Sequence, residues 1–218
     1  MSRVIGPMLR ILVVGLVLLA AATVWLSNIR QLSQPPTVAT VLPEPLALPQ
    51  VQLTDQAGNA FKTSDLNDAF TFLFFGFTNC PDICPLTLQT LANVEAELIE
   101  RGDYTPGVVF VSVDFERDTP AQIQRYLSNF SPAFGGVTGS PEELQPLLST
   151  LGVVVERHEH PGSNAYSVTH SSTIFLIGPE MALIAVFSAP HDANVIATDY
   201  LRVLDIYRTR RINNSASL

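Results

Sequence analysis

Apolar positions along this chain fall into short continuous runs separated by segments with helical spacing. Residues 71–77 and 107–114 are apolar on both faces, as is typical of strands at the centre of a covered sheet. Between them, Leu88 and Leu91 belong to a helical repeat that continues to about residue 101. This order of strand, helix and strand predicts a βαβ unit.

The second half of the chain predicts three more helices and a pair of strands. Pro120 and Pro141 each lie in the first turn of a predicted helix, where proline is favoured. Strands at 173–177 and 183–187 flank a tight turn and must be antiparallel. A helix over 192–207 closes the domain.

A hairpin and one short strand complete the predicted fold. Residues 51–61 indicate an N-terminal hairpin with a Gly-containing turn, and 153–156 a short strand. The βαβ start and ββα finish predict an α/β, thioredoxin-like fold whose central mixed sheet is flanked by helices.

The N-terminal 30 residues follow a different pattern. An uncharged apolar run covers 11–26, after Arg3 and Arg10. A membrane-spanning helix needs about 20 apolar residues, whereas the apolar part of a cleaved signal peptide has about 7–15. Small residues at 20–22 offer a cleavage site, but the run continues past them, which favours an uncleaved transmembrane helix. The preceding positive charges predict that the N-terminus stays inside and that the bulk of the chain lies outside. The location we expect is the bacterial inner membrane, with a single pass and the domain facing the periplasm.

Composition divides the chain into four segments. Residues 1–30 form the anchor or signal, 31–50 a proline-rich tether, 51–208 the thioredoxin-like domain and 209–218 a flexible tail. The net charge of -8 argues against a nucleic-acid partner, because no basic stripe is available to neutralise phosphates.

Cys80 and Cys84 are the only cysteines among 218 residues, and they lie between the strand at 71–77 and the helix that follows it. A helix N-terminus stabilises thiolates. A structural disulfide closing so short a loop would contribute only about 2 kcal/mol. The pair therefore favours either thiol–disulfide exchange or a metal site, and two thiolates suit Cu(I) or zinc.

One of four histidines has a distinctive position. His158 and His160 lie in a polar loop, and His191 lies near the start of the last helix. His170 lies in the loop that leads into the strand at 173–177, where thioredoxin-type sheets carry a cis-proline. Two thiolates and one imidazole favour copper, with zinc as the alternative, because structural zinc usually has four ligands.

Two carboxylates are further candidates for the site. Asp114 lies at the end of the strand at 107–114 and either faces the site or forms a turn. Asp82, between the two cysteines, either tunes the charge of the site or is simply solvated.

Four motifs resemble the Sco/SenC family of copper-binding, thioredoxin-fold proteins of cytochrome c oxidase assembly. The motifs cover 75–85, 112–120, 136–139 and 168–171. The resemblance implies copper ligation by three residues, Cys80, Cys84 and His170, with Asp114 nearby in a supporting role. The chain departs from the family pattern at Asn79, Phe115 and Thr169, where His, Pro and Asp are frequent.

The resemblance implies a membrane-anchored copper chaperone that delivers copper to the dinuclear copper centre of cytochrome c oxidase. Its partners would be the copper-bearing oxidase subunit and a copper donor or thioredoxin-like protein. The alternative is a thiol–disulfide reductase that keeps client cysteines reduced, with Cys80 and Cys84 as its catalytic residues. The spacing of three residues argues against it, because redox motifs of this fold usually have two. A peroxidase of the same fold would need an activating arginine beside the thiol, which the motif does not show.

Overall fold

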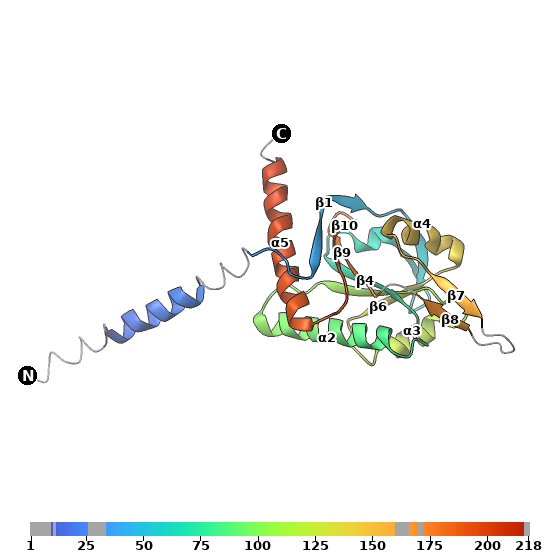
Figure 1. Cartoon of the computed structure of the whole chain (residues 1–218), viewed down its shortest axis with the longest axis horizontal. Helices are drawn as coiled ribbons and strands as arrows, with labels where there is room; N and C mark the ends of the chain where they lie inside the picture. Colours follow the sequence, from blue (N-terminus) through green and yellow to red (C-terminus); the bar gives the residue numbers. More distant parts are fainter. Residues whose placement is uncertain (1–9, 11, 26–33, 160–165, 170–171, 216–218) are drawn as a thin grey trace, which may run out of the picture.

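The computed structural model describes residues 10, 12–25, 34–159, 166–169 and 172–215. Its centre is an eight-stranded mixed sheet in the order β1-β10-β9-β4-β5-β6-β2-β3, and β7 and β8 pair in a separate ribbon (Figure 1). The strands are β1 (Ala39–Ala47), β2 (Gln52–Asp55), β3 (Ala60–Lys62), β4 (Thr71–Gly76), β5 (Gly107–Ser112), β6 (Gly135–Thr138), β7 (Glu156–Glu159), β8 (Tyr166–Thr169), β9 (Ile174–Gly178) and β10 (Ala182–Phe187). The helices are α2 (Ile83–Arg101), α3 (Pro120–Leu127), α4 (Pro141–Leu151) and α5 (Ala193–Ser215), with a short 3₁₀ helix, η1 (Thr63–Leu66).

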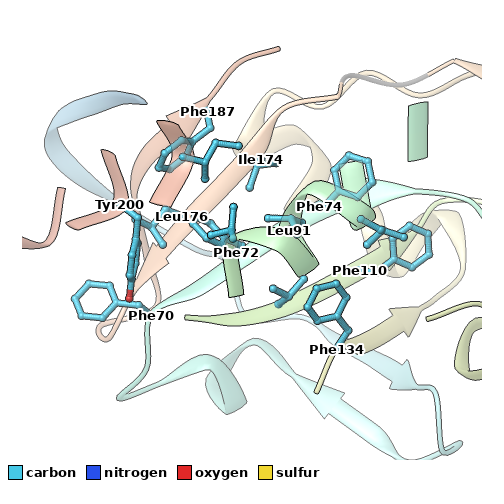
Figure 2. Packing of buried hydrophobic residues seen from close by; sticks show 14 of the residues in the cluster. Phe70, Phe72, Phe74, Leu91, Phe110, Phe134, Ile174, Leu176, Phe187 and Tyr200 are labelled. Carbon is cyan, nitrogen blue, oxygen red and sulfur yellow. The ribbon is translucent and has the colours of Figure 1, made fainter. Parts of the chain in front are cut away.

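Strand β4 lies in the middle of the sheet, and all of its residues are buried. It pairs in parallel with β5 and antiparallel with β9. Phe72 and Phe74 point to the face covered by α2, α3 and α5, where Figure 2 shows them among Leu91, Phe187 and Tyr200. Leu73 and Phe75 alternate to the opposite face and belong to the cluster that contains the leucines of α4. The apolar run at 71–77 is thus explained by burial on both sides.

The predicted thioredoxin-like arrangement is confirmed. Strands β4 and β5 are connected through α2 and run parallel, and β9 and β10 form an antiparallel pair that leads into α5. The predicted hairpin is also present as β2 and β3, with Gln52 opposite Lys62. Ser140 caps α4 through a capping box, and Gly152 ends that helix with a φ of 66°.

The predicted boundary between the tether and the domain is wrong. Part of the segment predicted as a tether, 31–50, forms the edge strand β1, which pairs with β10. Its pairing register shifts between Val41 and Leu46, where Pro43 and Pro45 interrupt the strand. Proline is tolerated at such an edge because an edge strand leaves one side of its backbone unpaired.

The C-terminal helix is longer than predicted. Helix α5 continues to Ser215 through most of the segment predicted as a flexible tail, 209–218. Arg210 donates to the carbonyl of Leu42 at 2.7 Å, and Arg211 pairs with Glu180 at 2.8 Å. These contacts explain why the helix does not end at 208. The strand predicted at 153–156 is instead β7, displaced toward the C-terminus.

The N-terminal segment is helical at residues 10 and 12–25. Within the described residues, no helix has the length and apolar character needed to cross a membrane. Residues 1–9, 11 and 26–30 of the predicted anchor lie outside the described residues. The transmembrane helix stays a prediction from the sequence.

Candidate metal centre

The two cysteines lie where the chain passes from β4 into α2. Cys80 is in the connecting loop, and Cys84 is in the first turn of the helix. The amide of Cys80 donates to the carbonyl of Phe77 at 3.2 Å, and the amide of Cys84 donates to the sulfur of Cys80 at 3.4 Å. Both cysteines are free thiols. The sequence prediction that a strand delivers two thiols to a helix N-terminus is confirmed.

The two thiols differ in their access to solvent. The side chain of Cys84 is completely buried, whereas Cys80 is partly exposed. Burial is the main cause that raises the pKa of the Cys84 thiol well above its ordinary range, and the nearby charges of Cys80 and Asp118 act in the same direction. A metal ion that binds Cys84 must therefore displace its proton. Cys80 is the sulfur that a partner protein can reach.

Gly76, the last residue of β4, is required by close packing beneath Cys84. A Cβ atom at this position would lie 2.9 Å from the Cys84 sulfur and 2.7 Å from Cε2 of Phe110. Both distances are shorter than a normal van der Waals contact. The glycine that ends the apolar run is therefore a determinant of where the buried sulfur lies.

Asp114 lies in the turn between β5 and α3 and is 3% exposed. Its carboxylate forms an ion pair with Arg117, and its carbonyl accepts from the amide of Asp118 at 2.8 Å. The Arg117 guanidinium in turn lies 5.9 Å from the centroid of the Phe77 ring, at the start of the cysteine loop. Asp114 thus holds a turn and, through Arg117, connects that turn to the cysteine loop.

Asp118, two residues before Pro120, is a further residue of this region, and the sequence pattern does not single it out as part of the site. It is 0% exposed. It accepts hydrogen bonds from the amide of Thr78 at 2.8 Å, the hydroxyl of Thr78 at 2.6 Å and the hydroxyl of Ser112 at 2.6 Å. The position of Asp118, four residues after Asp114 and just before a proline-started helix, also suits an ordinary cap. Only the fold shows that its carboxylate fastens the cysteine loop to β5.

Asp82 is the N-cap residue of α2, and its side chain makes no capping hydrogen bond. It is exposed to solvent. This placement agrees with the solvated alternative, and a role for Asp82 in tuning the site stays a prediction.

His170, the predicted histidine ligand, lies outside the described residues, as does His160. Within the part of the chain that the structure describes, no group of three or more His, Cys, Asp or Glu side chains could hold a metal ion. The sheet register nevertheless pairs Ile174, at the start of β9, with Phe74 near the end of β4. The start of β9, which follows His170 in the sequence by four residues, therefore lies at the sheet end that carries the cysteines.

His191 is engaged elsewhere. Its Nε2 atom lies 2.7 Å from the carbonyl of Ser172, which precedes β9. His191 was predicted to belong to the region that starts the last helix, and α5 begins two residues after it.

The donor set suits a soft metal ion. Two thiolates and an imidazole are ligands that Cu(I) accepts, and oxygen-preferring ions such as magnesium would bind this set poorly. Zinc, the alternative, would need a fourth ligand for a structural site.

The chain is similar in sequence to known proteins of one family. The model of the SCO1/SenC family matches residues 43–205 of the chain. A "Putative copper-binding protein" of Stutzerimonas stutzeri is 40% identical over 151 residues, which cover 69% of this chain and 73% of that protein. "Protein SCO1 homolog 1, mitochondrial" of Arabidopsis thaliana is 35% identical over 69% of this chain, but the match spans only 45% of that protein.

The structural likeness is equally extensive. The crystal structure of Arabidopsis thaliana ScoI with copper bound superposes with a TM-score of 0.69 at 33% identity, covering 73% of this chain and 98% of that one. The match reproduces the mixed sheet flanked by helices.

Proposed function

This chain belongs to the SCO1/SenC family, and we propose that it binds copper through Cys80, Cys84 and His170 and delivers it to the dinuclear copper centre of cytochrome c oxidase. The observation that carries the proposal is the pair of free thiols held at the start of α2, one buried and one accessible. Copper is the cargo in this function. Family membership supports the oxidase as its destination.

The asymmetry of the two thiols suits transfer rather than storage. Cys84 is anchored in the core under Gly76, so its sulfur can keep a bound ion in place. A client thiolate or imidazole would approach from the side of Cys80 and exchange ligands there. Transfer by shared ligands needs no free copper ion at any stage.

The location of the protein is part of the proposal. An N-terminal anchor in the bacterial inner membrane would hold the domain in the periplasm, next to a membrane-embedded client and at a high effective concentration. The apolar run at 11–26 and the positive residues before it support this placement. Membrane flotation of the full-length chain, compared with a chain in which three residues of the run are replaced by aspartate, tests it.

Copper loading of the full-length chain tests the central proposal. We expect one copper per chain and a thiolate-to-Cu(II) charge-transfer band, both lost in Cys80→Ser, Cys84→Ser and His170→Ala. His158→Ala is the matched control, because His158 belongs to β7 and to none of the four family motifs. Wild-type copper binding by His170→Ala would refute the assigned ligand set.

A thiol–disulfide reductase is the second candidate. The contact of 3.4 Å between the Cys84 amide and the Cys80 sulfur brings the two cysteines close enough to favour it. His170→Ala separates the two functions, because a reductase needs both thiols but no imidazole ligand. Full support of oxidase assembly by His170→Ala, with intact dithiol chemistry, would favour the reductase over the copper carrier.

A further inference from the structure

A buried carboxylate lies in the network that holds the cysteine loop. Asp118 accepts two hydrogen bonds from Thr78, which is two residues before Cys80, and one from Ser112 at the end of β5. This one buried side chain thereby links the loop that carries the accessible thiol to the central sheet.

The hydrogen bonds in this network suit an ionised carboxylate at Asp118. The amide side chain of Gln122 donates to the hydroxyl of Thr78 at 2.9 Å, and that hydroxyl donates to Asp118. The amide of Asp114 donates to the hydroxyl of Ser112 at 3.2 Å, and that hydroxyl also donates to Asp118. The backbone amide of Thr78 is the third donor. An ionised carboxyl group only accepts hydrogen bonds, which matches these three donors.

None of the ion pairs among the described residues includes Asp118, and the nearby guanidinium of Arg117 pairs with Asp114. A buried charge without a counterion is unfavourable unless hydrogen bonds satisfy it, as they do here. Thr78, which donates two of these hydrogen bonds, is two residues before Cys80, so the charge of Asp118 lies beside the cysteine loop. A negative charge beside this loop favours a cation bound there.

We propose that Asp118 is a positioning residue of the copper site and that its unpaired negative charge stabilises Cu(II) more than Cu(I). This inference rests on the proposed copper-binding function. The hydrogen bonds to Thr78 place Cys80 relative to Cys84. The charge acts on the bound ion, and its effect grows with the charge of that ion.

The test measures the affinities of the full-length chain for Cu(I) and for Cu(II) by competition with chelators of known affinity. Asp118→Asn removes the charge, and its amide fits the network: the oxygen accepts from the Thr78 amide and from Ser112, and the nitrogen donates to the Thr78 hydroxyl. We expect the ratio of the Cu(II) to the Cu(I) association constant to fall about tenfold, which raises the reduction potential of bound copper by about 59 mV.

Two further variants separate charge from structure. Asp199→Asn is the matched control, because Asp199 is equally buried but binds the amides of residues 37–39 and Arg202 on α5. It should lower stability and leave the affinity ratio unchanged. Thr78→Val removes the hydroxyl donor and keeps the Asp118 charge. It should weaken the binding of both ions by a similar factor.

An Asp118→Asn chain with the affinity ratio of the wild type would overturn the electrostatic part of the proposal. Wild-type affinities for both ions in Thr78→Val would overturn the positioning part, and this variant decides the matter if circular dichroism shows Asp118→Asn to be unfolded. If the wild-type chain itself binds no copper, the proposed function fails first, and the two failures are thereby distinguished.

Discussion

Replacing Gly76 with alanine should weaken copper binding more than any other single methyl group added to a strand of this sheet. The new Cβ would lie 2.9 Å from the Cys84 sulfur and 2.7 Å from Cε2 of Phe110. Favourable carbon contacts lie at about 3.5–4.0 Å, so each neighbour must move by roughly 1 Å or share that shift with the strand. The strand is central and paired on both sides, so the sulfur and the ring must give way.

Two consequences of different size follow. Overpacking a core typically costs about 1–3 kcal/mol, which corresponds to a fall in melting temperature of roughly 2–12 °C for a chain of this length. Metal–ligand distances tolerate only about ±0.2 Å. A shift of the Cys84 sulfur that is several times larger should therefore lower the affinity for Cu(I) by about 10–100-fold, as loss of a group that orients a ligand does.

Two other glycines provide matched controls. At Gly135 in β6 an added Cβ meets nothing closer than 3.6 Å, so alanine there should change neither quantity. At Gly136 an added Cβ would lie 2.4 Å from a methyl carbon of Ile123 and 2.6 Å from one of Leu127, so alanine should destabilise the fold without displacing a sulfur. Thermal unfolding by circular dichroism and chelator competition measure the two effects separately. Destabilised Gly76→Ala with wild-type copper affinity would refute the reasoning, because the glycine would then serve only the Phe110 ring.

Further predictions concern ionisation and the buried hydroxyls. Burial raises the pKa of the Cys84 thiol, so copper that binds below this pKa must displace a proton. The apparent affinity for Cu(I) should therefore rise with pH between 6 and 8. Calorimetry in two buffers should detect the released proton. The raised pKa of Cys84 also makes the stability of the metal-free fold depend on pH, because the thiol ionises more readily in the unfolded chain than in the folded one. The free energy of unfolding of the metal-free protein should therefore fall above about pH 8.5, where the unfolded thiol ionises. A melting temperature that stays constant from pH 8 to 10 would contradict this. The hydroxyl of Tyr126 is buried without a hydrogen-bond partner among the described residues, so Tyr126→Phe should leave stability unchanged or raise it by about 1 kcal/mol in urea unfolding. Tyr207→Phe, which removes a hydroxyl hydrogen-bonded to Glu180, should instead lower it.

The sequence predicts the central elements of the fold because their patterns are local. The apolar run at 71–77, the helical spacing that follows it and the tight turn between β9 and β10 can each be recognised from neighbouring residues alone. The edge strand β1 is different, because Pro43 and Pro45 are typical of a linker and only pairing with β10 makes them part of a strand. Helix α5 likewise extends past residue 208 because Arg210 and Arg211 find partners on β1 and after β9, which no local pattern indicates.

The candidate site likewise has residues that the sequence reveals and residues that only the fold reveals. Cys80 and Cys84 are evident in the sequence because two thiols three residues apart, between a strand and a helix, are rare by chance. Asp118 is not, because its role depends on Thr78, which is 40 residues earlier in the chain. An acidic residue before a helix is ordinary in any sequence, and what distinguishes this one is complete burial with no ion pair to another described residue.

Burial of Cys84, close packing against Gly76 and the Asp118 network all act on the same loop, and together they suit the proposed function, in which one short segment holds copper and releases it to a client. Cys84 is held in place by the core, so its position depends on the packing of β4 and Phe110. Cys80 packs only partly against the core, and its loop is held by hydrogen bonds to the carbonyl of Phe77 and between Thr78 and Asp118. Hydrogen bonds of this kind contribute about 1 kcal/mol each, far less than repacking a core. A client that competes for copper therefore meets the ligand whose displacement requires the smaller change in the protein, and release through Cys80 leaves the fold intact.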